Sequence, residues 1–315
     1  MKKIIILFLL VSVTVLSLPV VISNNKSAVA VVTHNIKKQD SNIVLLDTKT
    51  DKKTRLDLKK YLFCVVASEM PALYDEEALK AQTVAAYTYT LYKIEQNKGK
   101  SYDITADSVA DQSYADLEDI LDRWGENKNE YKERIEKAIN SVYGLALTYN
   151  GEPILAVYHA VSSGKTNTAK SVWGGDYPYL KSIDSSWDAL SGGYREEKVF
   201  SAEEFCEKLK DEVEFSGEAA NYISAKEQQS NKYVNTITIC KKQLKGAKIR
   251  SLFGLRSTCF DIDFDGQNFK FTTYGYGHNV GMSQYGADYM AKQGSSYKEI
   301  LSHYYKGAKL KRIKS

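Results

Sequence analysis

The 315-residue sequence is poor in the features that mark several protein classes. Four cysteines are too few for a disulfide-dense secreted scaffold. A net charge of only +4 gives no bulk electrostatic reason to bind nucleic acid. No Gly-x-Ser-x-Gly turn occurs, and the Gly-Lys-Thr at 164–166 has His159 where a phosphate-binding loop needs its first glycine. The four histidines are scattered, which argues against a metal site.

One long apolar run is present, at the N-terminus. It extends from Ile4 to Ile22 without a charged residue, and Lys2 and Lys3 precede it. At about 1.5 Å per helical residue, such a run approaches the ~30 Å core of a bilayer. We therefore expect residues 1–24 to be an uncleaved anchor, with the rest of the chain outside the cytoplasm. A cleaved signal peptide is the alternative.

The remaining sequence predicts an α+β fold, in which a helical block packs on an antiparallel sheet. Residues 25–54 are polar with short β-like runs and indicate a stalk or opening strands. Residues 55–310 form one domain, and a charged, Ser/Gly-containing stretch at about 184–232 indicates an inserted surface subdomain. Asn150-Gly151 predicts a hairpin, and Cys240 and Cys259 fall on predicted strands where a disulfide is possible.

Helix ends and strands can be placed from local patterns. We expect a helix that ends before Pro71, a helix capped by Asp75, and a half-buried strand at 260–264. Ser201 with Glu204 and Ser296 with Glu299 each predict a capping box.

A carboxylate on an apolar helix face is the first candidate for chemistry. Leu62, Val65 and Glu69 lie at i, i+3 and i+7, so they share one face of the helix. Partial burial raises the pKa of a carboxyl, and a neutral carboxylic acid near pH 7 serves as a general acid. The alternative is a helix-end glutamate that turns outward or is satisfied by backbone N–H groups.

Two loops supply further candidates. His159 leads into a Ser/Gly/Lys loop, which could equally be a polar turn with a half-buried histidine. The stretch 275–287 has glycines at 275, 277, 281 and 286, which permit tight turns and close approach to a ligand. Its His278, Ser283 and Gln284 offer donors and acceptors that suit sugar hydroxyl and acetamido groups.

These segments together resemble the stage II sporulation protein D family, which is related to the amidase-enhancer proteins. The matching stretches follow the family's order over nearly the whole chain after residue 55. They are Val65-Val-Ala-Ser-Glu-Met-Pro-Ala72, Glu77-Ala-Leu-Lys-Ala-Gln-Thr-Val-Ala-Ala86, Asp111-Gln112 with Tyr114, His159 with Ser162-Ser-Gly-Lys-Thr166, Tyr179-Leu-Lys-Ser182, Leu255-Arg-Ser-Thr258, Gly277-His278, Gly281-Met-Ser-Gln-Tyr-Gly-Ala287 and His303-Tyr-Tyr305.

The resemblance implies a membrane-anchored lytic transglycosylase that cuts peptidoglycan glycan strands, already stripped of stem peptides, during engulfment of the forespore. Glu69 stands where the family's catalytic glutamate stands, acting as acid and then base to give 1,6-anhydro-muramyl ends. The implied partners are the glycan, a cell-wall amidase and a membrane scaffold of the engulfment machinery; the implied location is the intermembrane space. Candidates for lining the cleft are Gln112, His159, Ser163, Lys165, His278 and Gln284.

The sequence departs from the family at several positions. Tyr87 replaces an arginine that many members carry, and Asn279 stands where many have glycine. Residues 160–175 contain neither His nor Cys, so the zinc that some relatives bind is not expected, nor is another cofactor. The alternative to an enzyme is a non-catalytic wall-binding protein that recruits or stimulates an amidase. A third reading is a surface protein whose cleft serves another polymer.

Overall fold

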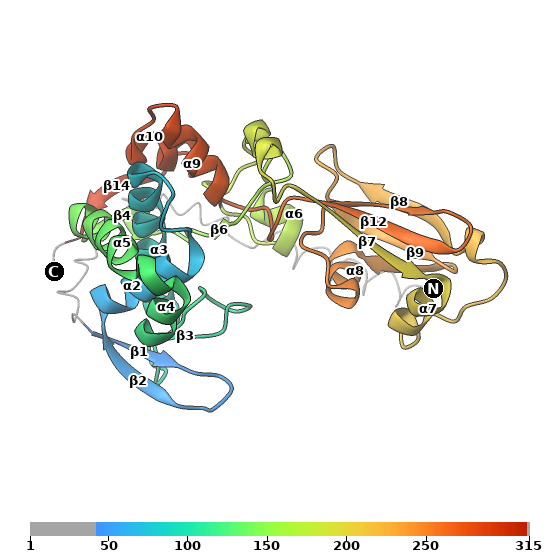
Figure 1. Cartoon of the computed structure of the whole chain (residues 1–315), viewed down its shortest axis with the longest axis horizontal. Helices are drawn as coiled ribbons and strands as arrows, with labels where there is room; N and C mark the ends of the chain where they lie inside the picture. The colour runs from blue at the N-terminus through green and yellow to red at the C-terminus, as the bar shows by residue number, and fades with distance from the viewer. Residues whose placement is uncertain (1–41, 314–315) are drawn as a thin grey trace, which may run out of the picture. The chain divides into compact units, whose positions relative to one another are not determined.

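The computed structural model describes residues 42–313, so the predicted anchor at 1–24 lies outside the described residues. Two hydrophobic cores organise this part of the chain. We call residues 42–194 and 275–313 the helical region and residues 195–274 the aromatic region, after their cores (Figure 1).

The helical region is built around one long helix, α3. Its elements are β1 (Asn42–Leu46), β2 (Lys53–Asp57), α2 (Leu58–Glu69), α3 (Glu76–Gln96), β3 (Ile104–Thr105), α4 (Leu117–Trp124), α5 (Lys128–Val142), β4 (Leu145–Tyr149), β5 (Glu152–Pro153), β6 (Tyr158–His159), α6 (Ala169–Trp173), β13 (Met282–Ser283), α9 (Gln284–Lys292), α10 (Tyr297–Tyr304) and β14 (Lys309–Arg312). Buried positions run from Ala78 to Leu91 almost without a break, so α3 is covered on all sides by α2, α5, α9, α10 and β4 (Figure 1).

The expected helix ends are confirmed. The Asp75 side chain accepts from the backbone N–H of Glu77 at the start of α3. Helix α2 ends at Glu69, and Met70 takes an extended conformation (ψ 136°), as the residue before a proline prefers. Both predicted capping boxes form, Ser201 with Glu204 and Ser296 with Glu299.

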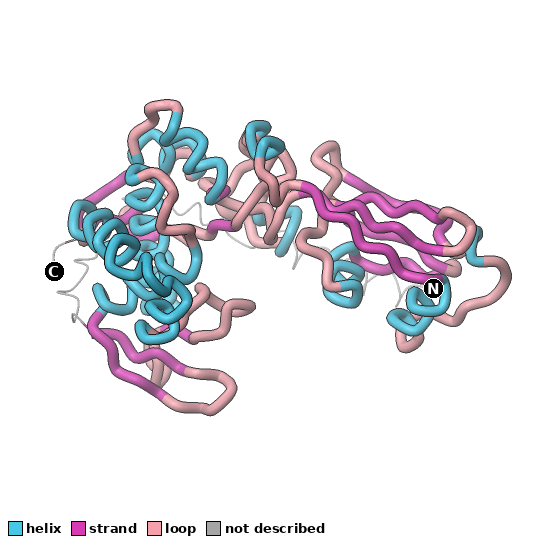
Figure 2. The backbone as a smooth tube through the Cα atoms, viewed as in Figure 1, coloured by secondary structure: helices cyan, strands magenta, loops and turns pink. Residues whose placement is uncertain are grey.

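The aromatic region encloses the second core. It consists of β7 (Arg195–Ser201), α7 (Ala202–Leu209), β8 (Ile223–Gln228), β9 (Val234–Ile239), β10 (Lys242–Lys245), α8 (Gly246–Phe253), β11 (Phe260–Phe264) and β12 (Asn268–Tyr274). Its strands form two antiparallel sheets, β10-β9-β8 and β11-β12-β7, and Figure 2 shows that they are longer than most strands of the helical region. The predicted strand at 260–264 is confirmed as β11.

The fold prediction needs two corrections. The α+β class is observed, but no single antiparallel sheet backs the helices, because α3 is buried mainly by other helices. The described strands form five small sheets instead, two of which contain parallel pairs, β1 with β3 and β6 with β13. The predicted transmembrane helix is also not supported: between residues 42 and 313 no helix is both long and apolar enough to cross a membrane.

Two expectations on shorter segments also differ from the structure. The predicted hairpin is cut short, because only Glu152 and Pro153 pair with β4 after the turn. The aromatic core continues to Phe271, past the C-terminal limit of about 232 that was expected for the insertion. All four cysteines are free, including Cys240 and Cys259.

Candidate active site

Glu69 is the last residue of α2, where the chain turns into the Pro71 loop. That loop is held from α5, since the Arg134 guanidinium donates to the carbonyl oxygens of Ala72 and Tyr74 at 2.8 and 3.0 Å. The end of α2 is therefore followed by a loop that α5 holds in place. This gives the Glu69 side chain a defined position.

The Glu69 carboxyl is half-buried, and no cation among residues 42–313 forms an ion pair with it. Its Oε1 accepts the backbone N–H of Ser113 at 2.6 Å, and the Ser113 hydroxyl and Gln284 amide also hydrogen-bond it. These donors lower the pKa of the carboxyl, but burial raises it more, so the net pKa lies above its usual value. Such a group retains its proton to higher pH than an exposed glutamate.

Ser113 is positioned by the two residues before it. The amide of Gln112 donates to the Tyr61 and Thr90 hydroxyls, and its oxygen accepts from Tyr158 at 2.8 Å. Gln112 is therefore buried with its polar atoms occupied by protein groups rather than facing open space.

Asp111 fixes the other side of the same segment. Its carboxylate pairs with Lys93 at 2.6 Å and accepts from the backbone N–H and hydroxyl of Thr105. The Asp111-Gln112 pair thus locks the chain on α3 and aims the following N–H at Glu69.

The glycine-containing stretch 275–287 reaches the same place. Gly281 has φ +72°, and a Cβ there would lie 2.0 Å from the Val157 carbonyl oxygen. This close contact aligns β13 with β6 and sets the start of α9, so Gln284 is directed toward Gln82 and Glu69. The close backbone approach at Gly281 is to the protein's own chain, and close approach to a ligand at this stretch stays a prediction.

His159 and His278 form a separate cluster. Their rings lie 5.5 Å apart, while Tyr158, one residue earlier on β6, points its hydroxyl to Gln112. Successive strand side chains face opposite ways, so β6 separates the histidines from the Glu69 network. His159 Nδ1 donates to the Val280 carbonyl at 3.0 Å, and its buried Nε2 has no partner among the described residues.

Burial keeps both histidines neutral at physiological pH. It lowers the pKa of His159 to about 3, with the neighbouring His278 adding to the effect, and lowers the pKa of His278 to about 4. Neutral rings offer lone pairs and N–H donors. They do not supply a positive charge.

Asn279 connects this cluster to the 159–166 loop. Its amide nitrogen donates to the Ser163 hydroxyl and the Lys165 carbonyl, both at 3.0 Å, and its oxygen accepts the Ser163 N–H. Its φ of +64° is in the left-handed region, which glycine and asparagine adopt most readily. The departure from glycine therefore keeps the backbone shape. The Lys165 side chain is exposed.

The sequence is similar to those of known proteins. A family sequence model described as "Stage II sporulation protein" matches residues 46–149. Stage II sporulation protein D of Bacillus subtilis is 37% identical over 281 residues, which cover 87% of this chain and 80% of that protein. The chain belongs to the stage II sporulation protein D family. This membership confirms the resemblance and assigns the chain to sporulation.

The chain is also similar to two further proteins. The protein of the same name from Bacillus amyloliquefaciens is 36% identical over 276 residues, or 86% of this chain and 79% of that protein. An amidase enhancer of Bacillus subtilis is 29% identical over 297 residues, covering 78% of this chain but only 39% of that protein.

The other departure of this family member, Tyr87, is buried in the helical core. Its ring packs on Tyr143 at 5.7 Å, and Tyr143 in turn faces Lys59. The side chain is 6% exposed, and burial raises its pKa to about 12. Tyr87 therefore contributes packing at this position.

Sequence reasoning missed several groups of the site. Ser113 and Tyr158 were not singled out, although they directly follow Gln112 and precede His159. A second buried carboxyl, Asp188, accepts the N–H of Ser162 at 2.6 Å and lies beside Gly286 at the start of α9. Burial raises its pKa, and no lone motif in the sequence marks it.

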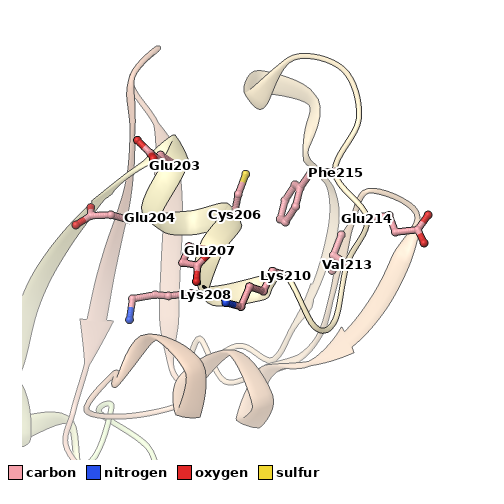
Figure 3. Close-up of a pocket in the computed structure, with 9 residues that line it drawn as sticks. All are labelled: Glu203, Glu204, Cys206, Glu207, Lys208, Lys210, Val213, Glu214 and Phe215. Atoms are coloured by element: carbon pink, nitrogen blue, oxygen red, sulfur yellow. Dashed lines mark hydrogen bonds and ion pairs between the residues drawn. The ribbon is translucent and has the colours of Figure 1, made fainter.

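A pocket of about 740 Å³ lies elsewhere, beside α7 (Figure 3). Cys206 and Phe215 face its opening, while Glu203, Glu204 and Glu214 point away from it (Figure 3). Its acidic groups therefore do not converge on one point. Among residues 42–313, no three metal-ligating side chains gather into a cluster.

Proposed function

We propose that this protein is a lytic transglycosylase that cuts peptidoglycan glycan strands, with Glu69 as its acid and base. The observation that carries the proposal is the half-buried Glu69 carboxyl, whose pKa is raised by burial and which forms no ion pair within the described part of the chain. A group of this kind can donate a proton near neutral pH. The proposed substrate is glycan whose stem peptides have been removed.

The proposed reaction needs only one carboxyl group. Glu69 first protonates the glycosidic oxygen, and the bond from that oxygen to the anomeric carbon breaks. The Glu69 carboxylate then takes the proton of the muramyl 6-hydroxyl, while the oxygen of that hydroxyl bonds to the anomeric carbon. The products are a 1,6-anhydro end and a free hydroxyl, and Glu69 recovers its proton without consuming water.

The surroundings of Glu69 favour this scheme over two-carboxylate hydrolysis. A retaining or inverting glycosidase needs a second free carboxylate about 5–9.5 Å from the first. Asp111 belongs to the same hydrogen-bond network, but Lys93, Thr105 and Tyr89 occupy its oxygens. Gln284 and Ser113 supply donors that stabilise the carboxylate once it has lost its proton.

We infer that the protein acts outside the cytoplasm, where its substrate lies, during engulfment of the forespore. A cell-wall amidase is the proposed partner, because removal of stem peptides must precede cleavage. The similarity to a protein named amidase enhancer supports this pairing. The buried Gln112 orients Ser113, while His159, Ser163, Lys165 and His278 are proposed to contact sugars beyond the cleaved bond.

The test compares the full-length protein with Glu69→Gln and with Glu95→Gln, the same change at an exposed site near the end of α3. Each is incubated with stripped glycan, and the fragments are analysed by mass spectrometry. We expect anhydro-ended fragments from the wild type and Glu95→Gln but not from Glu69→Gln. Equal cleavage by all three proteins would overturn the proposal.

A second candidate function is that of a non-catalytic amidase stimulator, which the amidase enhancer similarity favours. It predicts that wild type and Glu69→Gln both release no fragments and raise amidase activity to the same extent. Measuring the amidase rate in the same incubations separates the two functions.

A further inference from the structure

One arginine of the aromatic region is half-buried without an anionic partner. Arg250 lies on α8, and within residues 42–313 its guanidinium has one hydrogen bond, from Nε to the Leu255 carbonyl at a long 3.4 Å. By contrast, Arg195 and Arg256 pair with the carboxylates of Glu197 and Glu196. No carboxylate among residues 42–313 forms an ion pair with Arg250.

This arrangement is costly for the folded protein alone. A guanidinium carries five N–H donors, and burying a charge without a partner is unfavourable. Burial indeed lowers the pKa of Arg250, which shows that the groups around it do not offset its desolvation. A bound anion would satisfy both the charge and the remaining donors.

The neighbours of Arg250 include groups that suit a sugar. The Leu255 carbonyl that accepts from Arg250 is followed by Arg256, which touches the 275–287 stretch. The Arg256 carbonyl accepts the N–H of Gly277 at 3.0 Å, and its guanidinium lies 5.4 Å from the centre of the Tyr276 ring. Tyr276 is 50% exposed, and Trp173, 48% exposed, has its ring 5.0 Å from that of His278. Aromatic faces with an apolar body and a polar edge are suited to binding the ring of a saccharide.

We propose that Arg250 binds the carboxylate of an acidic sugar unit in the glycan, beside the aromatic faces of Tyr276 and Trp173. The inference rests on the proposed function. Hydrolysis of the amide that links a stem peptide to its lactyl group breaks the C–N bond, adds water and leaves a free carboxylate. Each stripped unit therefore gains a negative charge where an unstripped unit has a neutral amide.

Arg250 thereby provides a chemical basis for preferring stripped strands. A charged carboxylate can accept two N–H bonds from the guanidinium fork, while the oxygen of an amide at the same position carries no charge and accepts more weakly. An attached peptide would also need space beside a half-buried side chain. Both effects act in the same direction.

The test measures binding of full-length Glu69→Gln, used so that the ligand stays intact. The ligands are stripped glycan oligomers and the same oligomers with every carboxylate converted to a methylamide. We expect the carboxylate form to bind at least about tenfold more tightly, as hydrogen bonds to charged groups allow. Adding Arg250→Gln should remove this difference, mainly by weakening carboxylate binding, with a much smaller loss of methylamide binding.

A matched control is Arg195→Gln, which removes the same charge from an exposed pair in the same region. It should keep the preference, because the Arg195 guanidinium is already paired with the Glu197 carboxylate. If Arg250→Gln keeps the preference, or if Arg195→Gln loses it equally, the assignment of Arg250 is overturned.

The Glu69→Gln protein with Arg250 intact gives a second readout, which does not depend on whether the Arg250→Gln variant folds. Equal binding of the carboxylate and methylamide oligomers by Glu69→Gln alone overturns the proposal. Failure of the lyase function is seen separately, as absence of anhydro ends from the wild type while the carboxylate preference remains.

Discussion

The two cores of this chain bury different kinds of groups. The aromatic region packs phenylalanine on phenylalanine, with Phe205 and Phe269 stacked at 3.9 Å and Phe271 fully buried. The helical region instead buries Gln82 and Gln112 beside α3. Polar groups in a core cost free energy unless they are satisfied, so their presence indicates a purpose other than stability.

The buried polar groups of the helical region lie around Glu69. The hydrogen bonds of Gln112 hold the segment that donates to Glu69, and the amide of Gln82 reaches Glu69 only through Gln284. Gln82 Nε2 and Ser68 Oγ are buried without partners among the described residues. The helical region thus gives up packing and hydrogen bonds around the Glu69 carboxyl. In the aromatic region, by contrast, the partly buried carboxylates of Glu196 and Asp261 pair with cations.

The largest effect is expected at Glu69. Glu69→Gln should reduce glycan cleavage by about 10²–10⁴-fold, the usual contribution of general acid–base catalysis. The effect on the free energy of unfolding should be the opposite: relative to the wild type, Glu69→Gln should become more stable as pH rises. Because the folded pKa is raised above the usual value near 4.5, the wild type loses stability as pH rises from there toward the folded pKa.

Denaturant unfolding at pH 4 and pH 7 measures that second effect. Relative to the wild type, Glu69→Gln should gain stability between the two pH values, since glutamine does not ionise. A relative loss over that range would mean that the carboxylate is stabilised in the folded protein, which contradicts the assignment of an acid.

The next largest effect is expected in the aromatic core. Phe271→Ala should lower the free energy of unfolding by about 3–5 kcal/mol, because it leaves a cavity among Phe205, Phe253 and Phe260. Phe271→Leu retains more apolar volume and should cost less. Chemical denaturation of both variants checks this, and a cost under about 1 kcal/mol for alanine would show that the core collapses around the gap.

A smaller effect is expected at Gln112. Gln112→Leu leaves the Tyr61 and Tyr158 hydroxyls without their buried partner, which should cost about 1–3 kcal/mol. Cleavage should fall as well, because Ser113 loses its support. Thr90→Val removes one acceptor of Gln112 and serves as a milder control. Lost cleavage with unchanged stability would instead place Gln112 in contact with the substrate.

The smallest effect is expected at two helix N-caps, one in each region. Ser201 caps α7 and Ser296 caps α10, each through a complete capping box. Ser201→Ala and Ser296→Ala should each cost about 1 kcal/mol of stability. Thermal unfolding of the two variants checks this. A clearly larger loss for one of them would show that its region unfolds first.

Local patterns predicted the parts of this structure that local chemistry determines. Glu69 was placed by helical spacing and by Pro71, and the caps of α3, α7 and α10 by single residues and their partners three positions on. Such features depend on a few neighbouring residues. They could therefore be read before any fold was known.

The rest depends on contacts between distant segments. Ser113 is 44 residues from Glu69, and no spacing rule connects them. The division between the histidines and Glu69 depends on β6, which is only two residues long and has no periodicity to recognise. The Asp75 cap predicts where helix α3 begins, but it does not reveal that neighbouring elements cover this helix on all sides.

The central claim is that burial keeps a proton on Glu69, and the most direct test is the titration of that carboxyl. NMR of the protein with ¹³C-labelled glutamate side chains follows each carboxyl carbon with pH, and the signal absent from Glu69→Gln identifies Glu69. We predict a midpoint above the usual value near 4.5. A midpoint at or below that value would contradict the account.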